Sequence, residues 1–206
     1  MKTSDTAVQA FCREYLEGLK RVVDRVDTRQ IAALIAELQR AYDKDRQIFI
    51  LGNGGSAGTA SHMACDLAKN VIGKRLDRST RRFRVMSMTD NVPLITALGN
   101  DLGYEHVFTE QLLLFARPRD LLVVITGSGN SPNVVNAVKL AREMKLRTAG
   151  LLGFDGGQAR PLLDVAVLIP EPTYGYVEDL HMVIDHLLVA YFHKKFQTPE
   201  RVRRPG

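Results

Sequence analysis

Short apolar runs alternate with longer amphipathic segments along this chain of 206 residues. Five runs are short and apolar enough to be strands, and they lie at residues 48–51, 83–88, 121–126, 148–153 and 165–169. Strands that alternate with helices form a parallel sheet that is covered on both faces. We therefore expect an α/β fold with a five-stranded parallel sheet flanked by helices, a three-layer sandwich of the flavodoxin-like or Rossmann-like kind.

Two helical segments precede the first apolar run. Apolar residues recur at three- and four-residue steps from about residue 5 to 26 and again to about residue 43, with a break at Asp27 and Thr28. These segments carry no catalytic signal, so they either pack on the core or form a hairpin that pairs with another subunit. We expect residues 1–196 to form one domain that includes this N-terminal helical hairpin, and residues 197–206 to form a flexible tail.

The composition is that of an ordinary globular protein, with 45% hydrophobic and 25% charged residues. The N-terminus lacks an apolar signal-peptide core, and no apolar run approaches the roughly 20 residues of a membrane span. The two cysteines, Cys12 and Cys65, have no disulfide or metal spacing, so we expect a cytoplasmic protein. Much of the net charge of +5 lies in two basic runs, at residues 74–84 and 201–204. No aromatic-rich stacking motif or helix-turn-helix accompanies this charge, which argues against a nucleic-acid partner.

The sequence IFILGNGGSAGTASHMACD at residues 48–66 combines an apolar run, a glycine turn and a helical segment. Because a glycine turn exposes backbone N–H groups and a helix N-terminus favours anions, the turn around Gly54 predicts a phosphate site. His62 and Asp66 follow, four residues apart, and project from one face of the helix. This pair could bind a metal or move protons.

A second loop, TGSGNSPN at residues 126–133, follows the apolar run LLVVIT. Its hydroxyls, from Thr126, Ser128 and Ser131, can surround a phosphate with neutral donors. The loop lacks the lysine of a P-loop, and the acidic residue of a dinucleotide fingerprint follows neither loop, so nucleotide binding at these loops is disfavoured. Both loops should meet at the carboxyl edge of the sheet, where ligands bind in such folds.

The last helix, expected at about residues 176–196, is apolar apart from four ionisable side chains. These are Glu178, His181, Asp185 and His186. Glu178 and His186 are eight residues apart and can share a broad helix face. Because buried polar groups without partners are costly, some of the four are expected to line a site or an interface.

The motifs GNGGSAGTASH, TDN at residues 89–91, TGSGNSPN and EDLHMVIDH together resemble the SIS (sugar isomerase) domain, specifically its sedoheptulose 7-phosphate isomerase (phosphoheptose isomerase) group. The resemblance covers nearly the whole chain. It implies a homotetramer with active sites between subunits, which converts sedoheptulose 7-phosphate to D-glycero-D-manno-heptose 7-phosphate on the way to heptose nucleotides.

The resemblance also implies roles for individual residues. Asp66 falls at the position of the catalytic base and His186 at that of the partner acid. A divalent metal, usually zinc and one per subunit, would be held by His62, Asp66, Glu178 and His186. The substrate-binding residues would be Asn53, Gly54, Ser56, Asp90, Thr126, Ser128, Ser131 and Glu178, with the serines holding the phosphate.

The chain departs from the family pattern at several of these positions. Asp66 replaces a glutamate, Glu178 replaces a glutamine, and Asn70 and Tyr176 stand where basic residues are usual. Aldose–ketose interconversion needs a base, an acid and a group that polarises the oxygens, and these residues still supply all three. The alternative is a non-catalytic SIS tetramer that binds a replication initiator or senses a sugar phosphate, and needs neither metal nor base.

Overall fold

The computed structural model describes residues 2–72 and 80–197. Gln197 of the expected tail ends the last helix, whereas residues 198–206 and part of the basic run at residues 74–84 lie outside the described residues. Its sheet contains β1 (Gln47–Gly52), β2 (Arg84–Ser87), β3 (Leu121–Thr126), β4 (Arg147–Gly153) and β5 (Val165–Ile169). All neighbouring strands are parallel, in the order β2-β1-β3-β4-β5. The expected five-stranded parallel α/β fold is confirmed.

Both faces of the sheet are buried, which explains why its strands are continuous apolar runs. Side chains alternate between the faces along each strand. In β1, Ile48 and Ile50 join one core, whereas Phe49 and Leu51 join the other. The central strand β3 is buried along its whole length.

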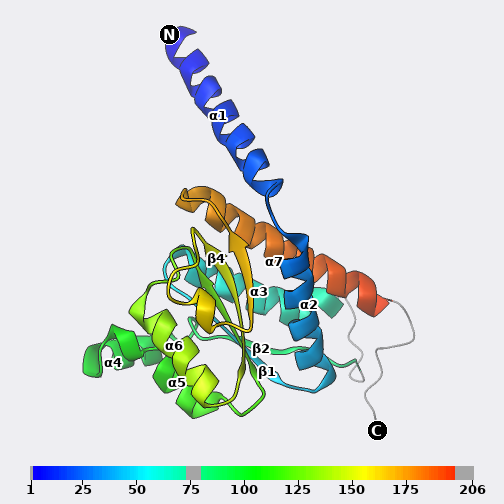
Figure 1. The fold of residues 1–206 in the computed structure, drawn as a ribbon, viewed down its shortest axis with the longest axis vertical. Coiled ribbons are helices and arrows are strands. Elements are labelled where there is room, and N and C mark those ends of the chain that lie inside the picture. The colour runs from blue at the N-terminus through cyan, green and yellow to red at the C-terminus, as the bar shows by residue number, and fades with distance from the viewer. Residues whose placement is uncertain (1, 73–79, 198–206) are drawn as a thin grey trace.

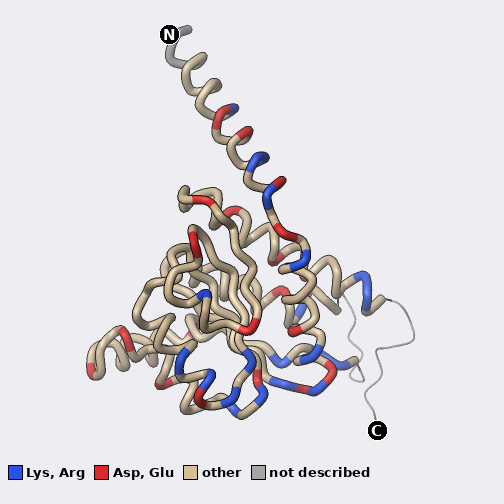
Figure 2. The backbone as a smooth tube through the Cα atoms, viewed as in Figure 1, with Lys and Arg blue, Asp and Glu red and all other residues tan. Residues whose placement is uncertain are grey.

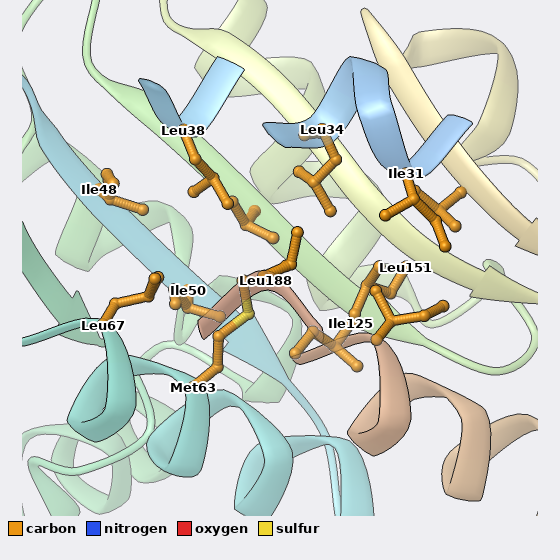
Figure 3. Close-up of a cluster of buried hydrophobic side chains, with 14 of the residues drawn as sticks. Ile31, Leu34, Leu38, Ile48, Ile50, Met63, Leu67, Ile125, Leu151 and Leu188 are labelled. Atoms are coloured by element: carbon orange, nitrogen blue, oxygen red, sulfur yellow. The ribbon is translucent and has the colours of Figure 1, made fainter. Parts of the chain in front are cut away.

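Helices cover each face and complete the three layers (Figure 1). One core contains side chains of α2 (Thr28–Asp43), α3 (Gly55–Lys69) and α7 (Tyr174–Gln197). The other core contains side chains of α4 (Val92–Asp101), α5 (Thr109–Phe115) and α6 (Pro132–Glu143). Figure 3 shows Leu34 and Leu38 of α2 facing the sheet. Both leucines are fully buried, and each such side chain contributes roughly 1.5–3 kcal/mol of stability.

The first helix, α1 (Lys2–Val23), projects from the rest of the chain (Figure 1). Its C-terminal end is anchored, because Val22 is buried in the core and the Tyr15 hydroxyl donates to Asp179 of α7 at 2.9 Å. Both helices of the expected hairpin are present, but α1 lies against the start of α7 and points away from α2. Its apolar residue Phe11 is 66% exposed, so the described part of this chain leaves it largely uncovered.

The sequence GNDLG at residues 99–103 predicts a loop, but this prediction is wrong because α4 continues to Asp101. The helix is well started, since the Asn91 side chain accepts from the backbone N–H of Leu94 at 3.2 Å. A glycine inside a helix costs only about 1 kcal/mol relative to alanine. The packing of Ile95 and Leu98 against the core outweighs that cost. The sequence of residues 106–115 predicts one helix, but α5 begins only at Thr109.

The strand order places a topological switch point between β1 and β3. From β1 the chain passes to β2 on one side, and from β2 it crosses to β3 on the other side. Ligands of open parallel sheets bind at this point, beyond the carboxyl ends of the strands. Across residues 2–72 and 80–197, no helix is long and apolar enough to cross a membrane.

Candidate active site

A cavity of about 260 Å³ lies at the switch point, beyond the carboxyl ends of β1 and β3. Both glycine loops and the start of α7 form its wall. The lining residues are Asn53, Gly54, Gly55, Ser56, Ile125, Thr126, Gly127, Ser128, Ser131, Tyr174 and Glu178. The structure thus brings both predicted phosphate loops together in one cavity, which we call the loop pocket.

Two helices begin at the loop pocket. α3 starts directly after Gly54, whose φ of 54° lies in the left-handed region that favours glycine. α6 starts directly after Ser131. Neither Gly54 nor Ser131 caps its helix with a side-chain hydrogen bond. The partial positive charges of two helix N-termini therefore converge on this cavity, and they favour an anion there.

The hydroxyl groups of the second loop are oriented by backbone amides. Thr126 Oγ1 accepts a hydrogen bond from the Gly129 N–H at 3.2 Å, and Ser128 Oγ accepts from the Asn130 N–H at 3.3 Å. An oxygen that is used as an acceptor keeps its own hydrogen for donation. Both hydroxyls can therefore donate to phosphate oxygens.

A pair of amide side chains joins the two loops. Asn53 Nδ2 donates to Asn133 Oδ1 at 2.9 Å, and Asn133 Nδ2 donates to Asn53 Oδ1 at 2.9 Å. The Tyr104 hydroxyl also donates to Asn53 Oδ1, at 3.2 Å. Sequence reasoning named Asn53 but missed Asn133, because a residue 80 positions away gives no local signal of this partnership.

Glu178 lies in the loop pocket, close to the backbone of Gly55. A Cβ atom on Gly55 would lie 3.0 Å from Glu178 Oε1, so the glycine leaves room for this carboxylate. Glu178 was expected both to bind substrate and to hold a metal. The structure places it among the residues that line the cavity, and it is not a member of the cluster of His62, Asp66, Asp185 and His186.

Asp90 lies apart from the loop pocket. It is exposed, accepts a hydrogen bond from the Ser61 hydroxyl, and lines a separate, open hollow beside Cys65. Ser61 belongs to α3, so the predicted sugar contact Asp90 is fixed to the helix that carries His62 and Asp66.

Four side chains from α3 and α7 lie together and could hold a metal ion, and we call them the histidine–aspartate group. They are His62, Asp66, Asp185 and His186, and one ligand atom from each lies within 4.8 Å of the others. The Nε2 atoms of the two histidines are 3.2 Å apart. His62 Nε2 is 3.5 Å from Asp66 Oδ2 and 4.0 Å from Asp185 Oδ2. Two imidazoles and two carboxylates form a ligand set suited to zinc and similar divalent cations.

Asp185 is the member of this group that sequence reasoning did not assign to the metal. Its side chain is fully buried, and within the described part of the chain neither carboxylate oxygen has a hydrogen-bond partner. Burial, together with the nearby charge of Asp66, raises the pKa of Asp185 to about 7. A bound cation would supply the missing partner, so these residues fit a metal site.

Asp66 is oriented by a residue one helical turn further on. Asn70 Nδ2 donates to Asp66 Oδ1 at 2.5 Å, which leaves Oδ2 on the side of His62. The Asp66 side chain is buried, and so is His181 on α7. Burial lowers the pKa of His181 to about 4, so that imidazole is neutral at neutral pH.

Comparisons with known proteins agree with this geometry. Residues 10–153 match the SIS domain family. The phosphoheptose isomerase of Pelobacter propionicus is 38% identical over 77% of this chain and 81% of its own length. That of Aliarcobacter butzleri is 37% identical over 87% and 93%. The solved structure of phosphoheptose isomerase from Neisseria gonorrhoeae aligns with a TM-score of 0.80 and 28% identity, covering 92% of this chain and 98% of that one.

Proposed function

The chain belongs to the phosphoheptose isomerase family of SIS-domain proteins, and we propose that it converts sedoheptulose 7-phosphate to D-glycero-D-manno-heptose 7-phosphate. One observation carries this proposal: α3 and α7 each reach from the loop pocket to the histidine–aspartate group. Ser56 and His62 are six residues apart on α3, about 9 Å along the helix axis. A sugar held by its phosphate at C7 presents C1 and C2 at the far end, where the ionisable groups lie.

In the loop pocket, hydroxyl and backbone donors would hold the phosphate. Ser56, Ser128 and Ser131 would donate to its oxygens, with Thr126 in support and the Gly54 turn providing backbone N–H groups. Neutral donors and helix dipoles can bind an anion without an arginine. The sugar hydroxyls would be contacted by Asn53, Asp90 and Glu178, whose carboxylate and amide groups accept hydrogen bonds.

The isomerisation needs one proton to move between adjacent carbons. Asp66 would remove the proton from C1 of the ketose and give an enediol. The protonated Asp66 would exchange this proton with solvent and then deliver a proton to C2, which forms the aldose. His186 would move the accompanying proton between the two oxygens. Asn70 would hold the Asp66 carboxylate in place during both steps.

A divalent metal, which we expect to be zinc at one ion per subunit, would be held by His62, Asp66, Asp185 and His186. It would supply polarisation of the substrate oxygens. The unpartnered buried carboxylate of Asp185 supports its inclusion as a ligand. In this assignment Glu178 faces the substrate.

The direct test is incubation with sedoheptulose 7-phosphate, with the product identified by NMR. We expect an aldoheptose 7-phosphate, together with deuterium at C2 when the reaction is run in D2O. The sugar phosphates of other chain lengths serve as controls for substrate specificity. Binding of the sugar phosphate without turnover would instead indicate a non-catalytic sensor.

We also propose that the chain assembles as a homotetramer with active sites between subunits. Both histidines of the histidine–aspartate group are exposed in the single chain. Val183 and Leu187, which are near His186 in the sequence of α7, are 50% and 42% exposed. Phe11 on the projecting α1 is exposed as well. Large exposed apolar patches mark protein interfaces, and these side chains of α7 and α1 would contribute to one. A cytoplasmic location suits the two free cysteines.

Placing a charge on α1 tests this assembly. Phe11→Asp is expected to convert the tetramer into smaller species, because it would bury an unpaired carboxylate in the interface. The molar mass is measured by size-exclusion chromatography with light scattering. Gln9→Asp, at another exposed position of the same helix, is the matched control. An unchanged mass for Phe11→Asp would place the interface elsewhere.

A further inference from the structure

A second cavity, of about 320 Å³, lies at the opposite edge of the sheet from the loop pocket, where the strands begin. It is formed by the end of α2 and the residues at the starts of β1, β3 and β4. We call it the basic cavity, and its lining residues are Glu37, Arg40, Ala41, Lys44, Arg46, Arg119, Leu121 and Arg147. Figure 2 shows Lys and Arg gathered at this lower end of the molecule.

The charge of this lining is strongly unbalanced, with five cationic side chains and a single carboxylate. That carboxylate, Glu37, is only 6% exposed and already has two partners. It accepts hydrogen bonds from Arg40 Nη1 at 2.9 Å and from Arg147 Nη2 at 2.8 Å. Glu37 therefore orders two guanidinium groups and leaves no acidic group on the lining for the others.

The remaining three cations are Lys44, Arg46 and Arg119. Among residues 2–72 and 80–197, no side-chain hydrogen bond or ion pair engages any of them. Like charges that line one cavity repel each other unless an anion lies between them. A helix dipole stabilises cations at the C-terminal end of the helix, which accounts for Arg40 and Lys44 at the end of α2. It does not account for the positive charges of Arg46 and Arg119, which lie outside that helix.

The backbone at Arg119 has an unfavourable conformation, which also suggests that this cavity binds an anion. Its φ is 75°, in the left-handed region that costs a residue with a side chain about 1–2 kcal/mol. The conformation is held by the Arg119 N–H, which donates to the Lys145 carbonyl oxygen at 2.9 Å. An arginine thus occupies a turn position at which glycine or asparagine would be less strained.

From these observations we propose that the basic cavity binds a nucleoside diphosphate or triphosphate. Three unpartnered cations suit an anion with at least two phosphate groups, because guanidinium groups bind phosphate oxygens through paired hydrogen bonds. Ala41 and Leu121 are nearly buried beneath the cavity, at 4% and 2% exposure. The planar guanidinium groups and aliphatic stems of the lining arginines supply the surface on which a flat base can stack. The lining contains no histidine and no free carboxylate that could act as a general base, so we expect this cavity to bind the nucleotide without catalysing a reaction. This inference does not depend on the proposed isomerase activity.

The proposal is tested by calorimetric titration of the full chain with ADP at fixed ionic strength. We expect a Kd below about 1 mM, and at least a tenfold weaker affinity in the double variant Arg46→Gln/Arg119→Gln. Arg82→Gln/Lys139→Gln, which changes the net charge equally at exposed positions outside the cavity, should bind ADP like the parent. The melting temperature of each variant without ligand establishes that it is folded.

Other outcomes would overturn the proposal. Absence of ADP binding would do so, and so would ADP binding that survives Arg46→Gln/Arg119→Gln but is lost in Ser128→Ala, because the nucleotide would then occupy the loop pocket. Inorganic pyrophosphate is the second probe. If pyrophosphate binds as tightly as ADP, the cavity recognises only the phosphate groups, and the nucleoside part of the proposal is wrong.

Discussion

Asp66→Asn is expected to lower the rate of isomerisation by about 10²–10⁴-fold, the usual contribution of a general base. The amide has nearly the same size and can keep a hydrogen bond with Asn70, but it cannot accept a proton from carbon. The rate is measured with sedoheptulose 7-phosphate, together with exchange of the C1 proton in D2O. Both should be lost while the oligomeric state is unchanged.

The control for this variant is Asp101→Asn, at the exposed end of α4 on the other face of the sheet. It removes the same charge away from the histidine–aspartate group, so its activity should match that of the parent. If Asp66→Asn retains more than a small fraction of activity, another group is the base. Glu178, the carboxylate of the loop pocket, would then be examined first.

Metal removal is expected to abolish activity and to lower the melting temperature. One ligand atom from each of the two carboxylates and two imidazoles lies within 4.8 Å of the others. Among the described residues, the buried carboxylate of Asp185 has no hydrogen-bond partner when no cation is bound. A ligand that binds only the folded state stabilises it by about 4 kcal/mol at a thousandfold excess over its Kd. Elemental analysis should give about one divalent ion per subunit for a single tetrahedral site.

Two variants distinguish the possible metal ligands. Asp185→Asn should weaken zinc binding by at least about tenfold, the scale for losing a ligand or its close support. Glu178→Gln should retain the metal, because its carboxylate lies beside Gly55 in the loop pocket. Equilibrium dialysis with elemental analysis measures both affinities without reference to turnover. Loss of metal in Glu178→Gln, with retention in Asp185→Asn, would restore Glu178 as the ligand.

The sequence predicted the sheet well because its strands are buried on both faces. The expected spans of β3 and β5 coincide with those in the structure, since each is an uninterrupted apolar run that ends at a polar residue or proline. The extension of α4 through Gly99 was missed, because the helix there is maintained by tertiary packing. Local glycine content carries no information about that packing.

The site was partly predictable for a related reason. Parallel strands bring their carboxyl ends together, so the meeting of the two glycine loops follows from the strand pattern. The position of Asp185 in the histidine–aspartate group could not be predicted from the sequence. The helical period of α7 does not show which of its several ionisable residues faces α3.

The paired amides of Asn53 and Asn133 have an evolutionary consequence. Each side chain both donates to and accepts from the other, so a change at either position alone leaves a partner amide with unsatisfied groups in a partly buried site. The two positions should therefore vary together among related sequences. The loops after β1 and β3, 80 residues apart at these positions, would then be inherited as a single recognition unit.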